Sequence, residues 1–371
     1  MSGNAASADA AGLHLPGLKG CSAPLSEHYD AALLDLDGVV YLGGIPIPGA
    51  SDALAGAAKR GMKLAYVTNN ASRSPNAIAA QLTGMGVAAT AADIVTSAQA
   101  AAHVLADRLP AGAPVLVVGG TGLRLAVRDR GLRPVTTAAD RPLAVVQGYS
   151  PGISYGLLAE AAIALNAGAL FVASNADATL PTPRGPQPGN GSLVQVLVHA
   201  TGQDPIVAGK PELPLHAESV QRVGAKRPIV VGDRLDTDIE GAVRGGSDSL
   251  LVLTGVSRPA DVLLAAPQRR PSYLAADLSG LNSSHPEVTS SGTGSNGDGF
   301  SCGGWTAQPA AGPAASGSAA AGWLTVSGTG AWMDGLRALC AAAWSAGPPP
   351  GDPAEQRRAA EAVLAAIEPA R

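Results

Sequence analysis

Two aspartates, Asp35 and Asp37, end an apolar run within residues 31–44, with one residue between them and Gly38 directly after. Two carboxylates this close repel one another, and burying either costs free energy unless an opposite charge neutralises it. A metal ion would neutralise both. A reaction in which one carboxylate attacks while the other moves a proton would also require such a pair. The spacing therefore indicates a metal site, a covalent catalyst, or both.

Three further polar signals follow apolar runs later in the chain. Each of them alone is typical of an ordinary turn or helix start. Ligands of open α/β sheets bind where parallel strands end, so signals at several strand ends indicate one shared site. The three signals are Thr68-Asn69-Asn70, Gly209-Lys210-Pro211, and Gly232-Asp233 followed by Thr237-Asp238.

Short aliphatic runs alternate with Ala-rich amphipathic segments from residue 29 onward. Continuous apolar runs predict strands covered on both faces, and their alternation with helices predicts βα units around parallel sheets. The fold class that we predict is therefore α/β, with a Rossmann-like parallel sheet. The runs expected to form strands are residues 31–36, 63–68, 114–119, 143–148, 169–174, 228–233 and 249–255.

Together, the stretches DLDGVVY, TNNASRS, GKP and GDRLDTDI resemble the four motifs of the haloacid dehalogenase (HAD) superfamily of phosphohydrolases. They are most similar to subfamily IIA, the phosphoglycolate and para-nitrophenyl phosphatases. The resemblance covers residues 29–281. It implies a HAD core with a large α/β (C2-type) cap inserted between the second and third motifs, and the stretch between Asn70 and Lys210 is long enough for one.

The resemblance implies that Asp35 is a nucleophile that forms an aspartyl-phosphate and that Asp37 is the general acid and base. The residue types agree, because phosphate monoesters hydrolyse very slowly without a nucleophile, neutralised charge and a proton. Two positions apart on a strand, both side chains point to the same side. The general-acid role requires an environment that raises the pKa of Asp37.

A Mg²⁺ ion is the expected cofactor. Asp35 and Asp233 would hold it, with the main-chain carbonyl of Asp37 as a third oxygen ligand, since Mg²⁺ binds one or two carboxylates, waters and phosphate oxygens. Asp238 is expected to orient a metal-bound water from behind these ligands. The alternative for Asp238 is an acidic residue in the first turn of a helix, where the helix dipole favours it.

Phosphate-binding groups are expected on the same strand ends. Thr68 offers a hydroxyl, Asn69 a main-chain N–H, and Lys210 a positive charge for the phosphoryl group and for Asp35. Gly38 permits a tight turn and a close approach of main chain to phosphate. Asn70 either adds its side-chain amide to the phosphate or closes the turn.

In the expected cap, residues 173–193 resemble the Ala-Thr-Asn-x-Asp stretch of the family, with Ser174 where Thr is usual. Asn175 and Asp177 are candidates to face the substrate. The alternative is that they shape the loop, because Asn and Asp often cap turns. Residues 39–50 predict a β-hairpin beside the site.

The composition of residues 282–321 is dominated by Ser, Gly, Pro, Ala and Thr, which cannot bury enough apolar surface to fold alone. The predicted organisation therefore has five parts. They are a flexible N-terminal tail (1–28), a core domain (29–104 and 201–281), an α/β cap (105–200), a disordered linker (282–321) and a small C-terminal segment of one strand plus helices (322–371).

The net charge is −4 over 371 residues, and the sequence shows no stripe of basic residues. Both observations argue against nucleic acid or an anionic membrane as partners. No secretory signal is recognisable, and no run reaches the roughly 20 apolar residues of a membrane span. Three scattered cysteines favour a reducing, cytoplasmic location and argue against zinc. The resemblance also implies a homodimer formed through the cap.

The sequence thus favours a Mg²⁺-dependent phosphatase acting on small phosphorylated metabolites such as 2-phosphoglycolate or aryl, sugar or nucleotide monophosphates. A phosphomutase or phosphotransferase using the same aspartyl-phosphate is the first alternative, since a large cap that excludes water suits either outcome. The second alternative is a regulatory or binding protein of the same fold that does not catalyse a reaction.

Overall fold

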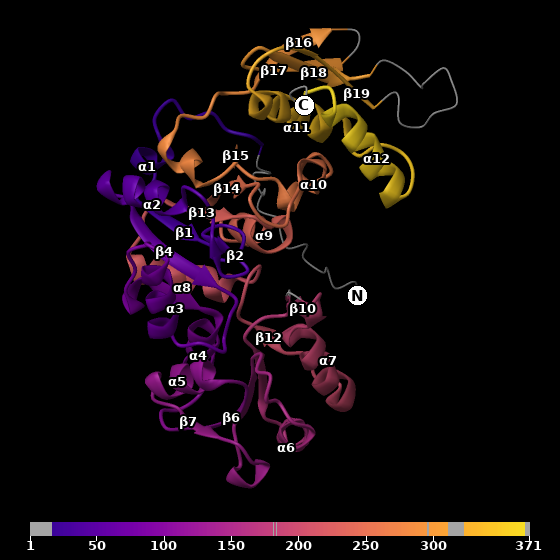
Figure 1. The fold of residues 1–371 in the computed structure, drawn as a ribbon. Coiled ribbons are helices and arrows are strands. Elements are labelled where there is room, and N and C mark those ends of the chain that lie inside the picture. The colour runs from indigo at the N-terminus through magenta and orange to yellow at the C-terminus, as the bar shows by residue number, and fades with distance from the viewer. Residues whose placement is uncertain (1–16, 181, 183, 295–296, 311–322, 368–371) are drawn as a thin grey trace, which may run out of the picture.

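The computed structural model describes residues 17–180, 182, 184–294, 297–310 and 323–367. Figure 1 shows three units arranged in a row, namely the core in the middle, the cap below it and a C-terminal unit above it. Within the described residues, no helix is long and apolar enough to cross a lipid bilayer.

The core is built on a six-stranded sheet in the order β15-β14-β13-β1-β4-β5, with every neighbouring pair parallel. Four of these strands (β1, β4, β13 and β14) form where continuous apolar runs predicted them, while β5 and β15 are too short to give such a signal. The strands are β1 (Ala31–Leu34), β4 (Lys63–Thr68), β5 (Ile94–Thr96), β13 (Pro228–Gly232), β14 (Asp248–Val252) and β15 (Tyr273–Ala275).

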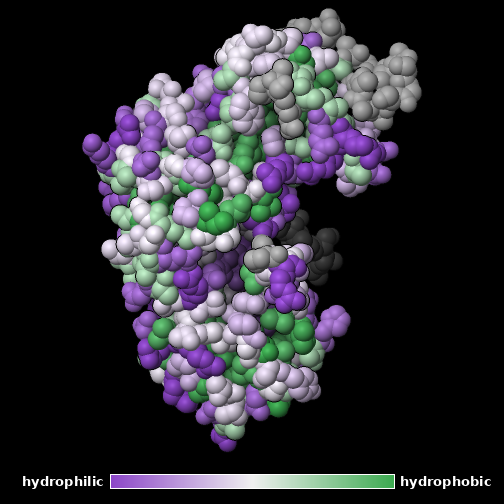
Figure 2. Space-filling model, viewed as in Figure 1, coloured by the Kyte–Doolittle hydropathy of each residue, from purple (hydrophilic) through white to green (hydrophobic). Residues whose placement is uncertain are grey.

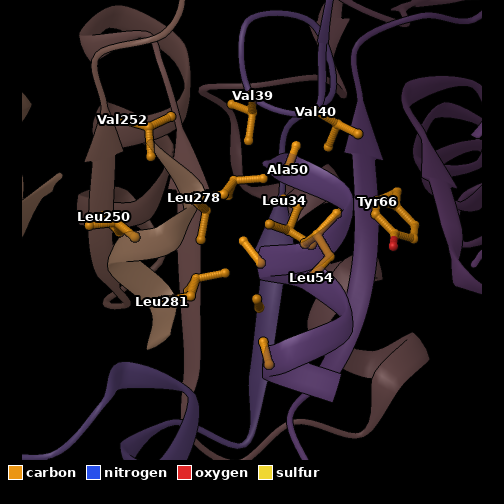
Figure 3. Packing of buried hydrophobic residues seen from close by; sticks show 14 of the residues in the cluster. Leu34, Val39, Val40, Ala50, Leu54, Tyr66, Leu250, Val252, Leu278 and Leu281 are labelled. Atoms are coloured by element: carbon orange, nitrogen blue, oxygen red, sulfur yellow. The ribbon is translucent and has the colours of Figure 1, made fainter. Parts of the chain in front are cut away.

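Alternate residues of β1 face opposite sides of this sheet. Leu34 packs with Leu54, Tyr66 and Leu250 in one apolar cluster, which Figure 3 shows between helix and sheet. Leu33 belongs to the cluster on the other face. The helices and helical turns of the core are α1 (Leu25–His28), α2 (Ala50–Lys59), α3 (Pro75–Gly84), η1 (Ala91–Asp93), α4 (Ser97–Ala106), α8 (Leu213–Val223), η3 (Leu235–Ile239), α9 (Glu240–Arg244), α10 (Pro259–Leu263), η4 (Pro267–Arg269) and η5 (Leu278–Asn282).

The cap contains a second parallel sheet, in the order β12-β9-β8-β6-β7. Its last strand, β12, pairs with β9, so the cap sheet extends beyond the predicted boundary at residue 200. A strand of two residues carries no apolar run, which is why the sequence did not reveal it. The cap elements are β6 (Pro114–Val118), α5 (Thr121–Asp129), β7 (Arg133–Val135), η2 (Ala138–Asp140), β8 (Ala144–Gln147), α6 (Tyr155–Asn166), β9 (Leu170–Ala173), β10 (Thr179–Leu180), β11 (Gln187–Pro188), α7 (Asn190–Thr201) and β12 (Ile206–Val207).

Core and cap share one apolar layer. Val67 and Val95 of the core sheet, Leu105 of α4, and Leu123 of α5 belong to the same buried cluster, which also reaches Val117 of the cap sheet. Helices α4 and α8 lie against one another, and α5 packs on α4. The cap is therefore attached to the core by buried side chains as well as by the two chain crossings.

The C-terminal unit corrects the prediction of a disordered linker. Within residues 282–321, an antiparallel sheet begins that continues into β19 and packs on α11. Cys302, Trp305 and Ala307 point into an apolar cluster with α11, so the helix supplies the apolar surface that the strands lack. The elements are β16 (Thr289–Gly294), β17 (Gly297–Cys302), β18 (Trp305–Pro309), β19 (Leu324–Gly328), α11 (Trp332–Ala346) and α12 (Pro353–Leu364).

This unit rests on the outer strand of the core sheet. The buried guanidinium of Arg337 in α11 donates from Nη2 to the main-chain oxygen of Leu274 in β15, over 2.7 Å. Trp344 donates from Nε1 to the main-chain oxygen of Val262 in α10, over 2.9 Å. Both contacts join the C-terminal unit to the core.

The described part of the predicted N-terminal tail is also ordered, while residues 1–16 lie outside the described residues. Lys19 N donates to Ser272 O, and Cys21 exchanges two main-chain hydrogen bonds with His285, all three over 2.8 Å. Leu25 is fully buried in the main apolar cluster. Residues 17–28 are therefore part of the core, because Leu25 fills space beside η5 that would otherwise be empty.

Candidate active site

The site is assembled from the carboxyl ends of three neighbouring strands. In the order β13-β1-β4, Asp233 follows β13, Asp35 follows β1 and Thr68 ends β4. Parallel pairing places these ends at one edge of the sheet. Lys210 comes directly after the cap sheet and before α8, so it reaches the same edge from the cap side. Figure 2 shows hydrophilic residues in the recess between core and cap.

Lys210 joins two carboxylates. Its Nζ pairs with Asp35 Oδ1 and lies 2.8 Å from Asp238 Oδ1, and it also donates to Val67 O over 3.3 Å. The side chains of Lys210, Asp35 and Asp238 are 12%, 15% and 1% exposed. Burial alone would lower the pKa of Lys210, but the charges of Asp238 and Asp35 outweigh it and raise that pKa. The ammonium is therefore charged at any ordinary pH.

Asp233 provides the vacant ligand atom that a cation needs. Its Oδ2 accepts a hydrogen bond from Val256 N over 2.6 Å, while its buried Oδ1 has no hydrogen-bond partner. One carboxylate oxygen each of Asp35, Asp233 and Asp238 lies within 4.8 Å of the others. Burial raises the pKa of Asp35 to about 7 and that of Asp233 to about 6. These three carboxylates fit a divalent oxygen-binding cation, which would neutralise them.

Gly38 is required by this crowding. Its φ of 89° lies in the left-handed region, and a Cβ there would lie 2.5 Å from Asp233 Oδ2. Its N–H donates to Tyr41 O over 2.7 Å and its carbonyl accepts from Thr254 Oγ1 over 2.5 Å. The turn at Gly38 therefore holds the chain against the carboxylates.

Asp37 lies on the rim, exposed, at the start of the turn that leads into the hairpin of β2 (Tyr41–Leu42) and β3 (Ile45–Pro46). The predicted hairpin at residues 39–50 is thus present. Partial burial raises the pKa of Asp37 above its ordinary value, although a hydrogen bond from the main chain of Gly43 opposes this. A raised pKa leaves a larger fraction of the carboxyl group protonated at a given pH, and only the protonated form can act as a general acid.

The loop after β4 holds Thr68, Asn69 and Asn70. Thr68 is buried, and its Oγ1 accepts from Asn70 N over 3.1 Å. Asn70 Oδ1 accepts from the main-chain N–H groups of Ser72 and Arg73 over 2.9 and 3.2 Å. Asn70 therefore closes the turn, which was one of the two alternatives for it.

Asn175 and Asp177 of the cap both contact Asn69. Asn175 Nδ2 donates to Asn69 O over 2.7 Å, and Asn69 Nδ2 donates to Asp177 Oδ2 over 3.2 Å. Burial raises the pKa of Asp177, while the hydrogen bond from Asn69 and the charge of Arg234 lower it in part. The two cap residues thus reach the site through the core loop.

Arg234 is a further candidate site residue, one that was not predicted from the sequence. It follows Asp233, is partly buried, and forms a two-point ion pair with Asp236 over 3.0 and 2.8 Å. Its main-chain N–H donates to Asp238 Oδ2 over 3.1 Å. The signal available in the sequence was an arginine inside the last motif, one position after its first aspartate.

Two protein-family models match this chain. Residues 32–133 match haloacid dehalogenase-like hydrolases, and residues 207–281 match a second HAD-like hydrolase model. The D-glycerol 3-phosphate phosphatase of Mycobacterium tuberculosis is 52% identical over 258 residues, which is 70% of this chain and 72% of that protein. The 5′-nucleotidase YutF of Bacillus subtilis is 36% identical over 232 residues, covering 62% of this chain and 89% of the relative.

Solved structures agree. The glycerol phosphate phosphatase of Mycobacterium tuberculosis in complex with magnesium has a TM-score of 0.78 at 44% identity, covering 92% of this chain and 99% of that chain. The p-nitrophenyl phosphatase from Archaeoglobus fulgidus has a TM-score of 0.64 at 29% identity, covering 68% and 98%.

This chain belongs to the haloacid dehalogenase-like hydrolases, and it is a phosphatase of that family. The resemblance to subfamily IIA, the α/β fold class and the enzyme class that the sequence predicted are confirmed. The prediction of Mg²⁺ is confirmed at the level of the family, through the relative solved with magnesium.

Proposed function

We propose that this protein is a Mg²⁺-dependent phosphatase that hydrolyses small phosphate monoesters through an aspartyl-phosphate on Asp35. One observation carries the proposal. A buried ammonium, Lys210, neutralises Asp35 beside Asp233, whose Oδ1 is buried without a partner. A nucleophile, a fixed positive charge and carboxylates that can hold a divalent cation are what attack on a phosphate dianion requires.

In the first step, a carboxylate oxygen of Asp35 attacks phosphorus and the bond from phosphorus to the alcohol oxygen breaks. Asp37 gives its proton to the leaving alkoxide. In the second step, Asp37 takes a proton from water, the water oxygen attacks phosphorus, and the bond to Asp35 breaks. Inorganic phosphate and the free Asp35 carboxylate result, so each residue returns to its starting state.

The remaining groups stabilise charge. Lys210 faces the oxygens of the phosphoryl group, and the Thr68 hydroxyl and Asn69 N–H offer it hydrogen bonds. Asp35, Asp233 and the carbonyl of Asp37 would hold Mg²⁺, with Asp238 behind them against Lys210 and Arg234. When bound, Mg²⁺ supplies positive charge that lowers the repulsion between carboxylate and phosphate.

Glycerol phosphates are the first substrates to test. The relative at 52% identity is named a D-glycerol 3-phosphate phosphatase. The rim of the site presents the charged groups of Asp37, Arg234 and Asp236, which suit a small hydroxylated leaving group.

The decisive experiment measures phosphate release from a panel of phosphorylated metabolites, with Mg²⁺ and with a chelator, for the wild type and for Asp35→Asn. We expect Mg²⁺-dependent release, highest for a glycerol phosphate, that disappears in the variant. Release that persists in Asp35→Asn would refute the mechanism. Phosphorylation of an added acceptor alcohol in place of water would favour the phosphotransferase alternative.

A further inference from the structure

Asn69 is the point where the core, the cap loop and Lys210 meet. Its main-chain oxygen accepts from Ser97 Oγ of α4 over 2.6 Å and from Asn175 Nδ2 of the cap over 2.7 Å. One carbonyl is thus held from both domains. The loop after β4 therefore has little freedom to move relative to the cap loop.

The side-chain amide of Asn69 also forms hydrogen bonds through both its oxygen and its nitrogen. Its Oδ1 accepts from Lys210 N over 2.8 Å, and its Nδ2 donates to Lys210 O over 3.2 Å. The same Nδ2 lies 3.2 Å from Asp177 Oδ2. The amide thus fixes both main-chain polar groups of Lys210 while it holds a carboxylate of the cap.

The packing around this amide is tight. A Cβ on Gly209, the residue before Lys210, would lie 2.6 Å from Asn69 Oδ1 and 2.6 Å from Ser174 O. The Lys210 main chain can approach both loops only because residue 209 has no side chain. A shift of the Asn69 loop, the Ser174 loop or the Lys210 main chain therefore displaces the other two.

We propose that Asn69 is a positioning residue that couples the cap loop to Lys210. The contact between Asp177 and Asn69 keeps the Asn69 amide in the orientation that holds Lys210, whose Nζ then stays on Asp35 and Asp238. Asp177 acts through Asn69 and does not need to touch the substrate. This inference rests on the proposed function, because its readout is the rate of phosphate release.

Only an amide satisfies all three partners. Lys210 presents an N–H and a carbonyl, so it needs an acceptor and a donor, and Asp177 needs a donor. A carboxylate at position 69 could accept from Lys210 N but would leave Lys210 O unpaired and would face Asp177 as a like charge. An amide at position 177 would remove that repulsion, because its NH₂ group can donate to the new carboxylate.

The test is a double-mutant cycle on kcat and KM with Asn69→Asp, Asp177→Asn and the two together, using the best substrate of the wild type. We expect Asn69→Asp to lower kcat at least tenfold and Asp177→Asn to lower it less than threefold. The double variant should recover at least fivefold over Asn69→Asp, since residues in contact give non-additive effects. The exposed cap residue Asp140, changed to Asn, should give no recovery in the Asn69→Asp background.

A double variant whose loss equals the product of the two single losses would overturn the proposal, because Asp177 would then act independently of Asn69. If Asn69→Asp does not fold, the cycle is run with Asn69→Ser and Asp177→Ala. Asp177→Ala should then cost at least fivefold in the wild type but less than twofold in Asn69→Ser. Equal losses in both backgrounds would overturn the proposal. A wild type that releases no phosphate would refute the proposed function instead.

Discussion

Lys210 Nζ lies 2.8 Å from Asp238 Oδ1, and the Asp238 side chain is 1% exposed. Buried carboxylates are stable only when an opposite charge or hydrogen bonds compensate for lost hydration. Lys210 provides that charge for Asp238 and for Asp35 at once. The same ion pairs that prepare the site for phosphate therefore also keep the core folded.

Replacing Lys210 by Met removes this charge and keeps the length of the side chain. We expect phosphate release to fall by at least about a hundredfold, since a buried charge that stabilises the transition state is lost. The free energy of unfolding without metal should fall by about 3 kcal/mol, because two buried carboxylates lose their cation. Urea unfolding and steady-state kinetics measure both. Unchanged kinetics would show that Lys210 has no catalytic role.

Asp35→Asn should abolish turnover, with a loss of at least roughly a thousandfold in kcat, because an amide is a far weaker nucleophile than a carboxylate. The fold should persist, since the amide removes a buried negative charge. Asp52→Asn, at an exposed position in α2, is the matched control and should keep full activity. Phosphate release and thermal unfolding separate the two effects. Turnover by the Asp35 variant at a tenth of the wild-type rate would contradict the role.

Metal removal should act on stability in a pH-dependent way. In the metal-free protein, burial raises the pKa of Asp35 to about 7 and of Asp233 to about 6, from an ordinary 3.8. Their contribution to stability is therefore complete below pH 3.8 and is lost as pH rises through 6 and 7. Mg²⁺ binds the ionised carboxylates, so it should raise Tm more at pH 8 than at pH 5.

Thermal unfolding with Mg²⁺ and with a chelator, at several pH values, checks this prediction. Asp233→Asn should remove most of the Mg²⁺ effect at pH 8. A Tm difference that stays constant between pH 5 and pH 8 would show that these carboxylates do not titrate in that range.

Glu218 of α8 links the core to the cap through ion pairs. Its buried carboxylate lies 2.6 Å from His103 Nδ1 of α4, 2.9 Å from Arg130 Nη2 at the end of α5, and 2.6 Å from Arg222 Nη2. Burial alone would raise the pKa of Glu218, but hydrogen bonds from Arg222 and His103 and the charge of Arg130 lower it.

Glu218→Gln should therefore lower the free energy of unfolding by about 2 kcal/mol at pH 7, because the partly exposed guanidinium groups of Arg130 and Arg222 lose the buried carboxylate that they share. The difference from wild type should shrink as pH falls below 4.5, since a carboxyl with a lowered pKa loses its stabilising effect when it is protonated. Glu361→Gln, in an exposed pair on α12, should change stability by less than about 0.5 kcal/mol. Equal effects of both substitutions in urea unfolding would contradict the role of Glu218.

The sequence was sufficient to locate the strand ends that carry the site. Asp35, Thr68 and Asp233 each follow or end a continuous apolar run, and such runs form β1, β4 and β13. Parallel pairing of neighbouring strands then brings the three together without further information. This part of the site depends on local signals, which a single sequence contains.

What the sequence could not reveal depends on distant partners. The side chain of Asn69 bonds to Asp177, 108 positions away, and to Lys210, 141 positions away. In the same way, Trp305 of β18 is buried by contacts with α11. In the sequence, α11 is separated from β18 by a stretch rich in Ser, Gly and Ala. Composition measures the apolar surface of a segment by itself and not the surface that a later helix brings to it.

The hydrogen bond from Arg337 to Leu274 has a consequence for solubility. β15 is one of the two edge strands of the core sheet, and without Arg337 the Leu274 carbonyl would be free to pair with a strand of another molecule. Arg337 occupies that acceptor, and the bulk of α11 stands against the strand. A chain ending near residue 288 would retain every proposed catalytic residue but would expose the unpaired edge of β15. Such an edge can pair with a strand of another molecule and cause aggregation, so the C-terminal unit protects the enzyme against aggregation through this strand.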